Sequence, residues 1–150
     1  MPDNHDLIDG RWVPQLILTQ DHTLAGSHKG TVRVEAGKFT LAGKINGTLV
    51  IHNGVEARIE GVQQGTISVA RGATVTVMGA IEGTTSISPG GTVIVEAGGK
   101  LAGTLSNEGL VIVRGVFGGI QTGQGKLKLE GRGYVKQPVT DENGVSYYQW

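Results

Sequence analysis

Short stretches in which every second residue is apolar run through most of this chain. TVRV at 31–34, TISV at 66–69 and TVIV at 92–95 are examples. Because successive side chains of a strand point to opposite faces, this alternation predicts β-strands with one buried face. A helix is disfavoured, because the apolar residues lack helical spacing and glycine interrupts every segment long enough to form a helix. The residues expected to point inward are Val32, Val34, Leu49, Ile51, Ile67, Val69, Val93, Val95, Val111, Val113, Leu127 and Leu129.

The dipeptide Gly-Thr precedes many of these stretches at a nearly constant spacing. Its threonines are Thr31, Thr48, Thr66, Thr84 and Thr92, with steps of 17, 18, 18 and then 8 residues. Each full step holds three short apolar pieces separated by glycine, as one turn of a solenoid would. The pattern predicts an all-β fold, a right-handed three-sided parallel β-helix (β-solenoid) of about seven turns. The right hand of the solenoid is expected from the usual chirality of parallel crossovers.

Two alternatives remain open at this level. An antiparallel β-sandwich also consists of short strands with frequent turns. The 8-residue step before Thr92 is either a slip that moves Thr92 to a neighbouring face or a local loop at Ser88-Pro89-Gly90-Gly91, and the slip is preferred. The segments 31–47 and 92–109 match almost side for side, because both contain VEAG and then LAG.

Composition supports a folded chain with glycine corners. Glycine contributes 26 of 150 residues and proline 4, while the abundant, periodically placed Val, Ile and Thr argue against disorder. The 13 basic and 13 acidic residues balance, which gives no electrostatic reason to expect nucleic acid or an anionic membrane as a partner. There is no cysteine, no signal-like start and no apolar run long enough to span a bilayer. We therefore expect a cytoplasmic protein without membrane contact.

The flanks of the repeat differ from it. Residues 1–15 form a non-repetitive N-terminal segment, residues 16–138 the solenoid, and residues 139–150 an aromatic C-terminal tail. A solenoid exposes backbone and core at both ends, and these ends must be covered or paired. We expect the tail to be a cap or a docking segment. The aromatic residues that are candidates for interaction or capping are Trp12, Tyr134, Tyr147, Tyr148 and Trp150.

Candidate catalytic and metal-binding groups are scattered. The four histidines, His5, His22, His28 and His52, lack metal-ligand spacing, and no nucleophile elbow or phosphate-binding lysine motif is present. Glu35 and Glu60 would form an acidic pair only if they stacked on one face, as a carbohydrate-active β-helix requires. Only Thr74 and Thr76 form the paired threonines that an ice-binding surface repeats. We expect no enzyme activity, no metal and no cofactor.

Three pieces of the form apolar-x-Gly-x-apolar, at 41–45, 77–81 and 101–105, together with Ser86-Ile87-Ser88-Pro89-Gly90-Gly91, resemble the bactofilins. These are small bacterial cytoskeletal proteins with a right-handed triangular β-helix. The resemblance covers about residues 31–135. It implies domains that join end to end, head to head and tail to tail, into filaments without nucleotide.

Two functional hypotheses follow. The first is a structural protein that assembles with copies of itself through its ends or faces, without nucleotide. The second is a non-polymerising module, such as an inhibitor or immunity-type protein, that binds another protein through a flat face or the aromatic tail. The second follows if the tail covers an end that assembly needs. The assembly state separates the two.

Overall fold

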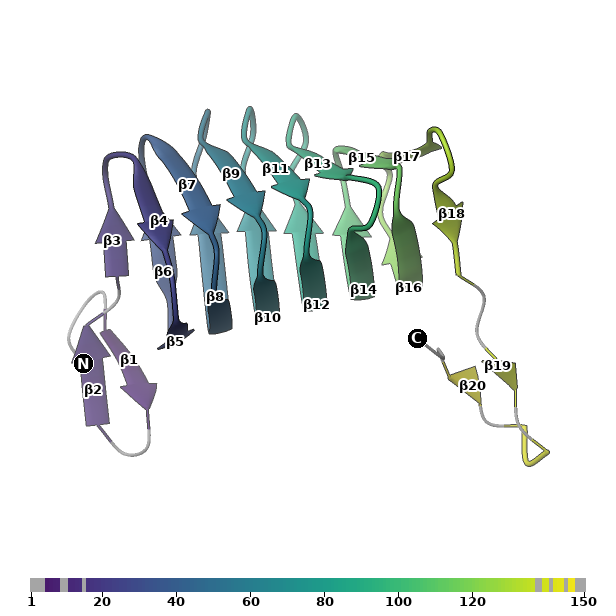
Figure 1. The fold of residues 1–150 in the computed structure, drawn as a ribbon, viewed down its shortest axis with the longest axis horizontal. Helices are drawn as coiled ribbons and strands as arrows, with labels where there is room; N and C mark the ends of the chain where they lie inside the picture. The colour runs from purple at the N-terminus through teal and green to yellow at the C-terminus, as the bar shows by residue number, and fades with distance from the viewer. Residues whose placement is uncertain are drawn as a thin grey trace.

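The computed structural model describes residues 5–8, 11–14, 16–136, 139–140, 142–144 and 146–147, with side chains described for 16–136 and 142–144. Every regular element in these ranges is a β-strand. The strands stack along one axis into an elongated body, and a small antiparallel hairpin lies beside each end (Figure 1). The β-solenoid predicted from the sequence is confirmed. The parallel pairing of its strands makes the antiparallel sandwich wrong.

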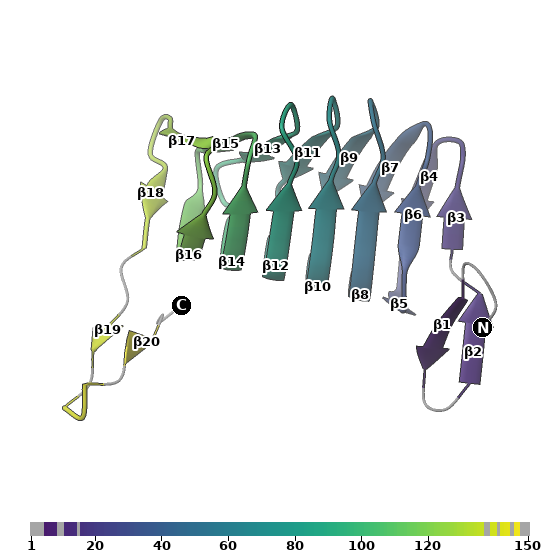
Figure 2. The same ribbon diagram turned by 180° about the vertical axis from the view of Figure 1, so that it is seen from behind.

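Two parallel sheets build the solenoid, and Figure 2 shows the strands of the first side by side. The first sheet contains β3 (Leu16–Leu18), β5 (Ser27–Lys29), β6 (Val32–Val34), β8 (Lys44–Ile51), β10 (Val62–Val69), β12 (Ala80–Ile87), β14 (Lys100–Asn107), β16 (Val116–Thr122) and β18 (Tyr134–Val135). The second contains β4 (His22–Leu24), β7 (Lys38–Leu41), β9 (Glu56–Ile59), β11 (Thr74–Val77), β13 (Thr92–Val95), β15 (Leu110–Val113) and β17 (Lys126–Leu129). The hairpins are β1 (His5–Ile8) with β2 (Arg11–Pro14), and β19 (Val139–Thr140) with β20 (Ser146–Tyr147).

A glycine bends each long strand of the first sheet, so that one strand supplies two sides of the turn. In β8 the bend is Gly47, with side 1 before it and side 2 after it, and the following strand β9 forms side 3. Gly47, Gly65 and Gly83 stack at this corner with φ of 159°, 105° and 116°. A Cβ on Gly65 would overlap the carbonyl oxygen of Gly47 in the turn below. Glycine is therefore required here by both the backbone angle and the close approach of neighbouring turns.

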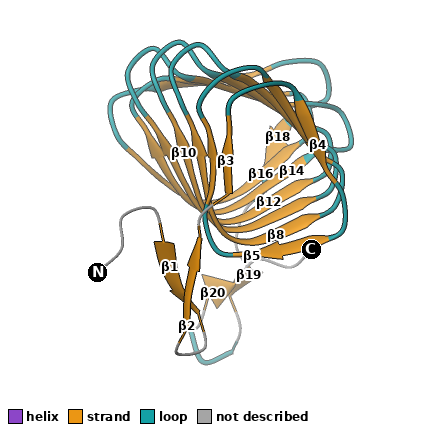
Figure 3. Ribbon diagram, turned by 90° about the vertical axis from the view of Figure 1, so that its left-hand side faces the viewer, coloured by secondary structure: helices purple, strands orange, loops and turns teal. Residues whose placement is uncertain are grey.

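The solenoid is right-handed. Seen from the N-terminal end, the chain passes through β3, β4 and β5 clockwise while it moves away from the viewer (Figure 3). This is the hand expected for parallel crossovers.

Strand register settles the interpretation of the Gly-Thr repeat. Thr48, Thr66 and Thr84 stack on side 2, whereas Thr92 lies on side 3 beside Thr74. The change of face predicted for Thr92 is confirmed, and a loop with the face unchanged is wrong. The side 2 column continues with Thr104, so the stack itself has no break.

The two matching segments, 31–47 and 92–109, do not stack on each other. The first starts with β6 on side 2, and the second starts with β13 on side 3. The two similar segments therefore begin on neighbouring sides of the solenoid. It arises because all three sides need the same succession of inward apolar residues and corner glycines.

The core is a set of stacked inward columns. Ten of the twelve residues predicted to point inward are buried, from Val32 to Val113. Leu127 is partly buried, and Leu129 is 52% exposed although the register keeps it in the predicted inward column. Leu129 points along the inward column, but β17 is the edge strand of its sheet and no described strand covers it.

The solenoid holds a whole number of turns. It begins on side 2 with β3 and ends on side 1 with β18, so the seven turns leave no side missing or added. Both ends consequently fall at the corner between side 1 and side 2. The two hairpins lie next to that corner, outside the cross-section of the solenoid in the end-on view (Figure 3). No helix in the described parts of the chain is long and apolar enough to cross a membrane.

Candidate functional site

The C-terminal end of the solenoid exposes a slice of its core. In the inward columns Leu129 is 52% exposed, and Leu127 and Val135 are only partly buried. Ile120 and Tyr134, 65% and 53% exposed, lie in outward columns on the wall beside this end. β17 and β18 are the edge strands of their sheets at this end. Exposed apolar side chains on an unpaired strand edge form a surface that can pair with another chain.

The N-terminal end is a second open edge, with smaller apolar groups. β3 and β4 are the edge strands here. Leu16 and Leu24 are partly buried, and Ile17 is 39% exposed. The described part of the molecule therefore has two open edges, one at each end of its axis.

The aromatic candidates are placed unevenly by the structure. Tyr134 lies on β18 at the C-terminal end. In the hairpins, Trp12 pairs with Leu7 and Tyr147 with Val139 through the backbone, and their side chains lie outside the described residues. Tyr148 and Trp150 lie wholly outside them. The β19–β20 hairpin lies beside the solenoid rather than over its end (Figure 1), and capping by the aromatic side chains stays a prediction.

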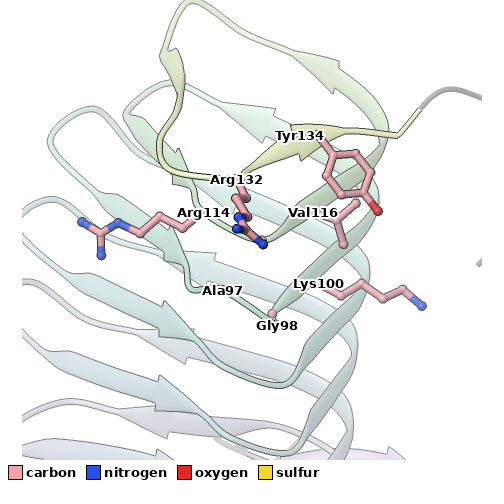
Figure 4. A pocket seen from close by; sticks show the side chains of 9 residues that line it. Ala97, Gly98, Lys100, Arg114, Val116, Arg132 and Tyr134 are labelled. Atoms are coloured by element: carbon pink, nitrogen blue, oxygen red, sulfur yellow. The ribbon is translucent and has the colours of Figure 1, made fainter.

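A groove of about 360 Å³ opens at the corner between side 3 and side 1. It exists because the corners vary in length. The corner at Arg114-Gly115 has two residues, whereas the corners at 96–99 and 130–133 on either side have four and stand higher. Lys100, Arg114, Arg132 and Tyr134 line the groove, and Arg132 reaches from its corner toward Gly98 (Figure 4).

The basic residues of the groove differ in how they are neutralised. Arg114 Nη1 donates to Glu96 Oε1 at 2.8 Å and Arg114 Nε to Glu130 Oε1 at 3.1 Å. The hydrogen bond that Arg114 donates to Glu130 and the negative charge of Glu96 raise the pKa of the Arg114 guanidinium. Arg132 has no ion-pair partner among the described residues. Its charge is therefore available to an anionic group in the groove.

A second ion-pair ladder joins three adjacent turns on side 1. Gln64 Nε2 donates to Glu82 Oε1 at 3.0 Å, and Lys100 Nζ donates to Glu82 Oε2 at 3.2 Å. The hydrogen bond from Gln64, followed by that from Lys100, lowers the pKa of Glu82 below its usual range. This ladder fixes the stacking of turns, and it leaves Glu82 ionised at neutral pH.

Three other acidic residues lie near basic side chains, which belong to the neighbouring turn for Glu56 and Glu35 and to the same turn for Glu60. Lys38 lies 3.8 Å from Glu56, Arg58 lies 3.4 Å from Glu60, and His52 Nε2 lies 4.0 Å from Glu35. Glu35 follows side 2 and Glu60 follows side 3, so the two do not form the stacked pair considered above. Within the described residues, no group of three His, Asp or Glu side chains could hold a metal ion.

Three buried polar residues interrupt the apolar columns, and the alternation did not reveal them. Gln63, Thr85 and Asn107 are each 0% exposed. Asn107 is satisfied, because it donates to the Lys126 carbonyl and accepts from Gly109 N–H at 2.9 and 3.0 Å. Gln63 Oε1 and Thr85 Oγ1 have no hydrogen-bond partner among the described residues. Aligning the turns on their corner glycines would have placed all three in inward columns.

Fold and surfaces together define a β-solenoid protein with two open ends and a partly neutralised basic groove near one of them. No protein-family model matches the chain, and neither curated proteins nor solved structures gave a match. The two open ends and the groove are therefore the features that bear on function.

Proposed function

We propose that this protein is a structural, bactofilin-like scaffold that assembles with copies of itself through the ends of its solenoid. The observation that carries the proposal is the open C-terminal slice of core, with Leu129 more than half exposed and Leu127 and Val135 only partly buried. Stacking another copy there would bury these side chains and pair the edges of both sheets. Such assembly needs no nucleotide, metal or catalytic group. The proposal includes the cytoplasmic location expected from the sequence.

Negative-stain microscopy and light scattering of the purified chain test this function. We expect elongated assemblies whose mass rises with protein concentration. Leu129→Lys should abolish them, because the ammonium group would be buried without a partner at the interface. The matched control is Met78→Lys, which replaces another exposed apolar residue, 44% exposed, at a corner in the middle of the solenoid. A wild-type chain that stays monomeric at high concentration would refute the proposal, as would equal effects of the two variants.

The second candidate is a protein-binding module that stays discrete. The groove between the corners at 96–99 and 130–133 favours it, since Arg132 and Tyr134 could receive an acidic side chain of a partner. Deleting residues 139–150 separates the two. If the tail covers an end, the shortened chain should assemble more readily than the full chain. If the tail is a docking segment of the discrete module, deletion should remove partner binding and leave the mass unchanged.

A further inference from the structure

The geometry points to polar, head-to-tail assembly, in which the C-terminal end of one copy sits on the N-terminal end of the next. This inference rests on the proposed self-assembly and adds its direction. It differs from the head-to-head and tail-to-tail joining that the family resemblance implies. The order of the sides supports this direction. The last strand of one copy lies on side 1 and the first strand of the next copy lies on side 2, so the order of sides within each copy continues across the junction.

Strand register shows which residues would meet. The inward column that contains Leu24, Leu41 and Ile59 ends at Leu129. Continued by one turn, this column would place Leu129 against Leu24 of the next copy, so that two incompletely buried leucines cover each other. The contact needs no shift of register along the strands.

Another outward column on side 3 brings opposite charges together. It runs from Asp21, whose Oδ1 accepts from Lys38 N–H at 2.9 Å, to Lys126 on β17. In a head-to-tail stack Lys126 would lie next to Asp21 of the following copy. Rim charges of this kind select orientation and speed association more than they add affinity.

The net charges of the two ends also favour head-to-tail contact. Residues 1–29 contain four acidic and two basic residues, a net charge of −2. Residues 120–136 contain four basic and one acidic residue, a net charge of +3, and the two acids of the tail reduce this to +1 for residues 120–150. Head-to-head and tail-to-tail contacts would each join ends of like sign, whereas head-to-tail contacts join opposite signs.

The terminal hairpins do not cover the end faces, but a head-to-tail contact brings β19–β20 of one copy next to β1–β2 of the following copy at their common corner. Both β1–β2 and β19–β20 lie outside the cross-section of the solenoid when it is viewed along the axis (Figure 3). In the side view both hairpins lie below the solenoid, and β19–β20 reaches past β18 along the axis (Figure 1). As described, neither hairpin covers the face on which the next copy would sit.

Two end-blocked variants test the direction. Leu24→Lys disables the N-terminal end and Leu129→Lys disables the C-terminal end, and circular dichroism checks that each variant folds. For head-to-tail assembly, each variant alone should have the mass of one chain, and an equimolar mixture should form a species of twice that mass. Dimers formed by each variant alone, with no mixed species, would instead show joining of like ends and overturn the inference.

Cross-linking provides a second measurement that does not depend on substituting leucine. The chain has no cysteine, so introduced pairs react cleanly. Thr23 and Lys128 are exposed and occupy the same outward column, at opposite ends. In the continued stack their Cα atoms would lie about 4.8 Å apart, within disulfide range. Oxidised Thr23→Cys/Lys128→Cys protein should give a ladder of covalent multimers on a non-reducing gel, while neither single variant should give a ladder.

The outcomes separate this inference from the proposed function. If wild-type chains do not associate at all, both fail. If they associate but the double-cysteine variant gives no ladder, or the mixed end-blocked variants give no dimer, assembly stands and its head-to-tail direction is wrong. A rise in salt should weaken head-to-tail association, because it screens the attraction between the two ends.

Discussion

Thr85 gives a prediction whose sign runs against the usual effect of a core substitution. Its side chain is fully buried on β12, in the column between Ile67 and Leu105, and its Oγ1 has no hydrogen-bond partner among the described residues. Placing an unsatisfied hydroxyl in such surroundings costs about 1–3 kcal/mol. Thr85→Val keeps the branched shape and β-propensity while it removes this penalty. We expect the variant to be more stable by about 1–2 kcal/mol.

Denaturant unfolding followed by circular dichroism measures this change, and thermal unfolding gives an independent value. For a chain of this size each kcal/mol should raise Tm by about 2–4 °C. Thr84→Val is the matched control, because Thr84 is the exposed neighbour on the same strand and should be nearly neutral. Thr85→Ser, which keeps the hydroxyl and loses a buried methyl, should destabilise by about 1 kcal/mol. Loss of stability in Thr85→Val would show that the hydroxyl is hydrogen-bonded and refute the reasoning.

Three further variants test the fold and its ion pairs. Gly65→Ala should destabilise by more than about 2 kcal/mol in denaturant unfolding, since both its φ of 105° and the turn below exclude a Cβ; a neutral result would contradict the stacked corner. Val95→Lys should destabilise by more than about 4 kcal/mol, whereas Ile94→Lys on the opposite face of the same strand should stay within about 1 kcal/mol, and similar Tm values would contradict the inward assignment. The pKa of Glu82 is lowered in the folded state, so its ion pair contributes stability above the unfolded value of 4.5 that is lost as the pH falls through the folded pKa. Glu82→Gln should therefore flatten the acid limb of a stability–pH profile, and an unchanged limb would show that the ladder adds nothing.

The sequence was most informative about the walls of the solenoid. Val93 and Val95 are buried because alternation and corner glycines act locally, and every turn repeats the same local problem. Leu129 follows the same pattern but is exposed. Its burial depends on whether another turn lies above it, and periodicity does not contain that information.

The surfaces required more than the pattern. Gln63 resembles a solvent-facing residue within Val62-Gln63-Gln64, although it lies two residues before a corner glycine, the position that Ile45 and Ile81 occupy in neighbouring turns. The groove depends on corner lengths in three successive turns, which only the register reveals. The sequence contains the opposite net charges of the two ends, but the balanced net charge of the whole chain does not show this asymmetry.

Stacked corner glycines also make the length of the molecule adjustable in discrete steps. Residues 62–79 form one complete turn, and their excision would bring Gly83 onto Gly47 and Ile81 onto Ile45 without altering any other register. Each such loss or duplication changes the separation of the two hairpins by about 4.8 Å, and both hairpins keep their corner. Tandem duplication of an 18-residue unit would thus increase the spacing between the two hairpins in fixed steps, while leaving the ends of the solenoid chemically unchanged.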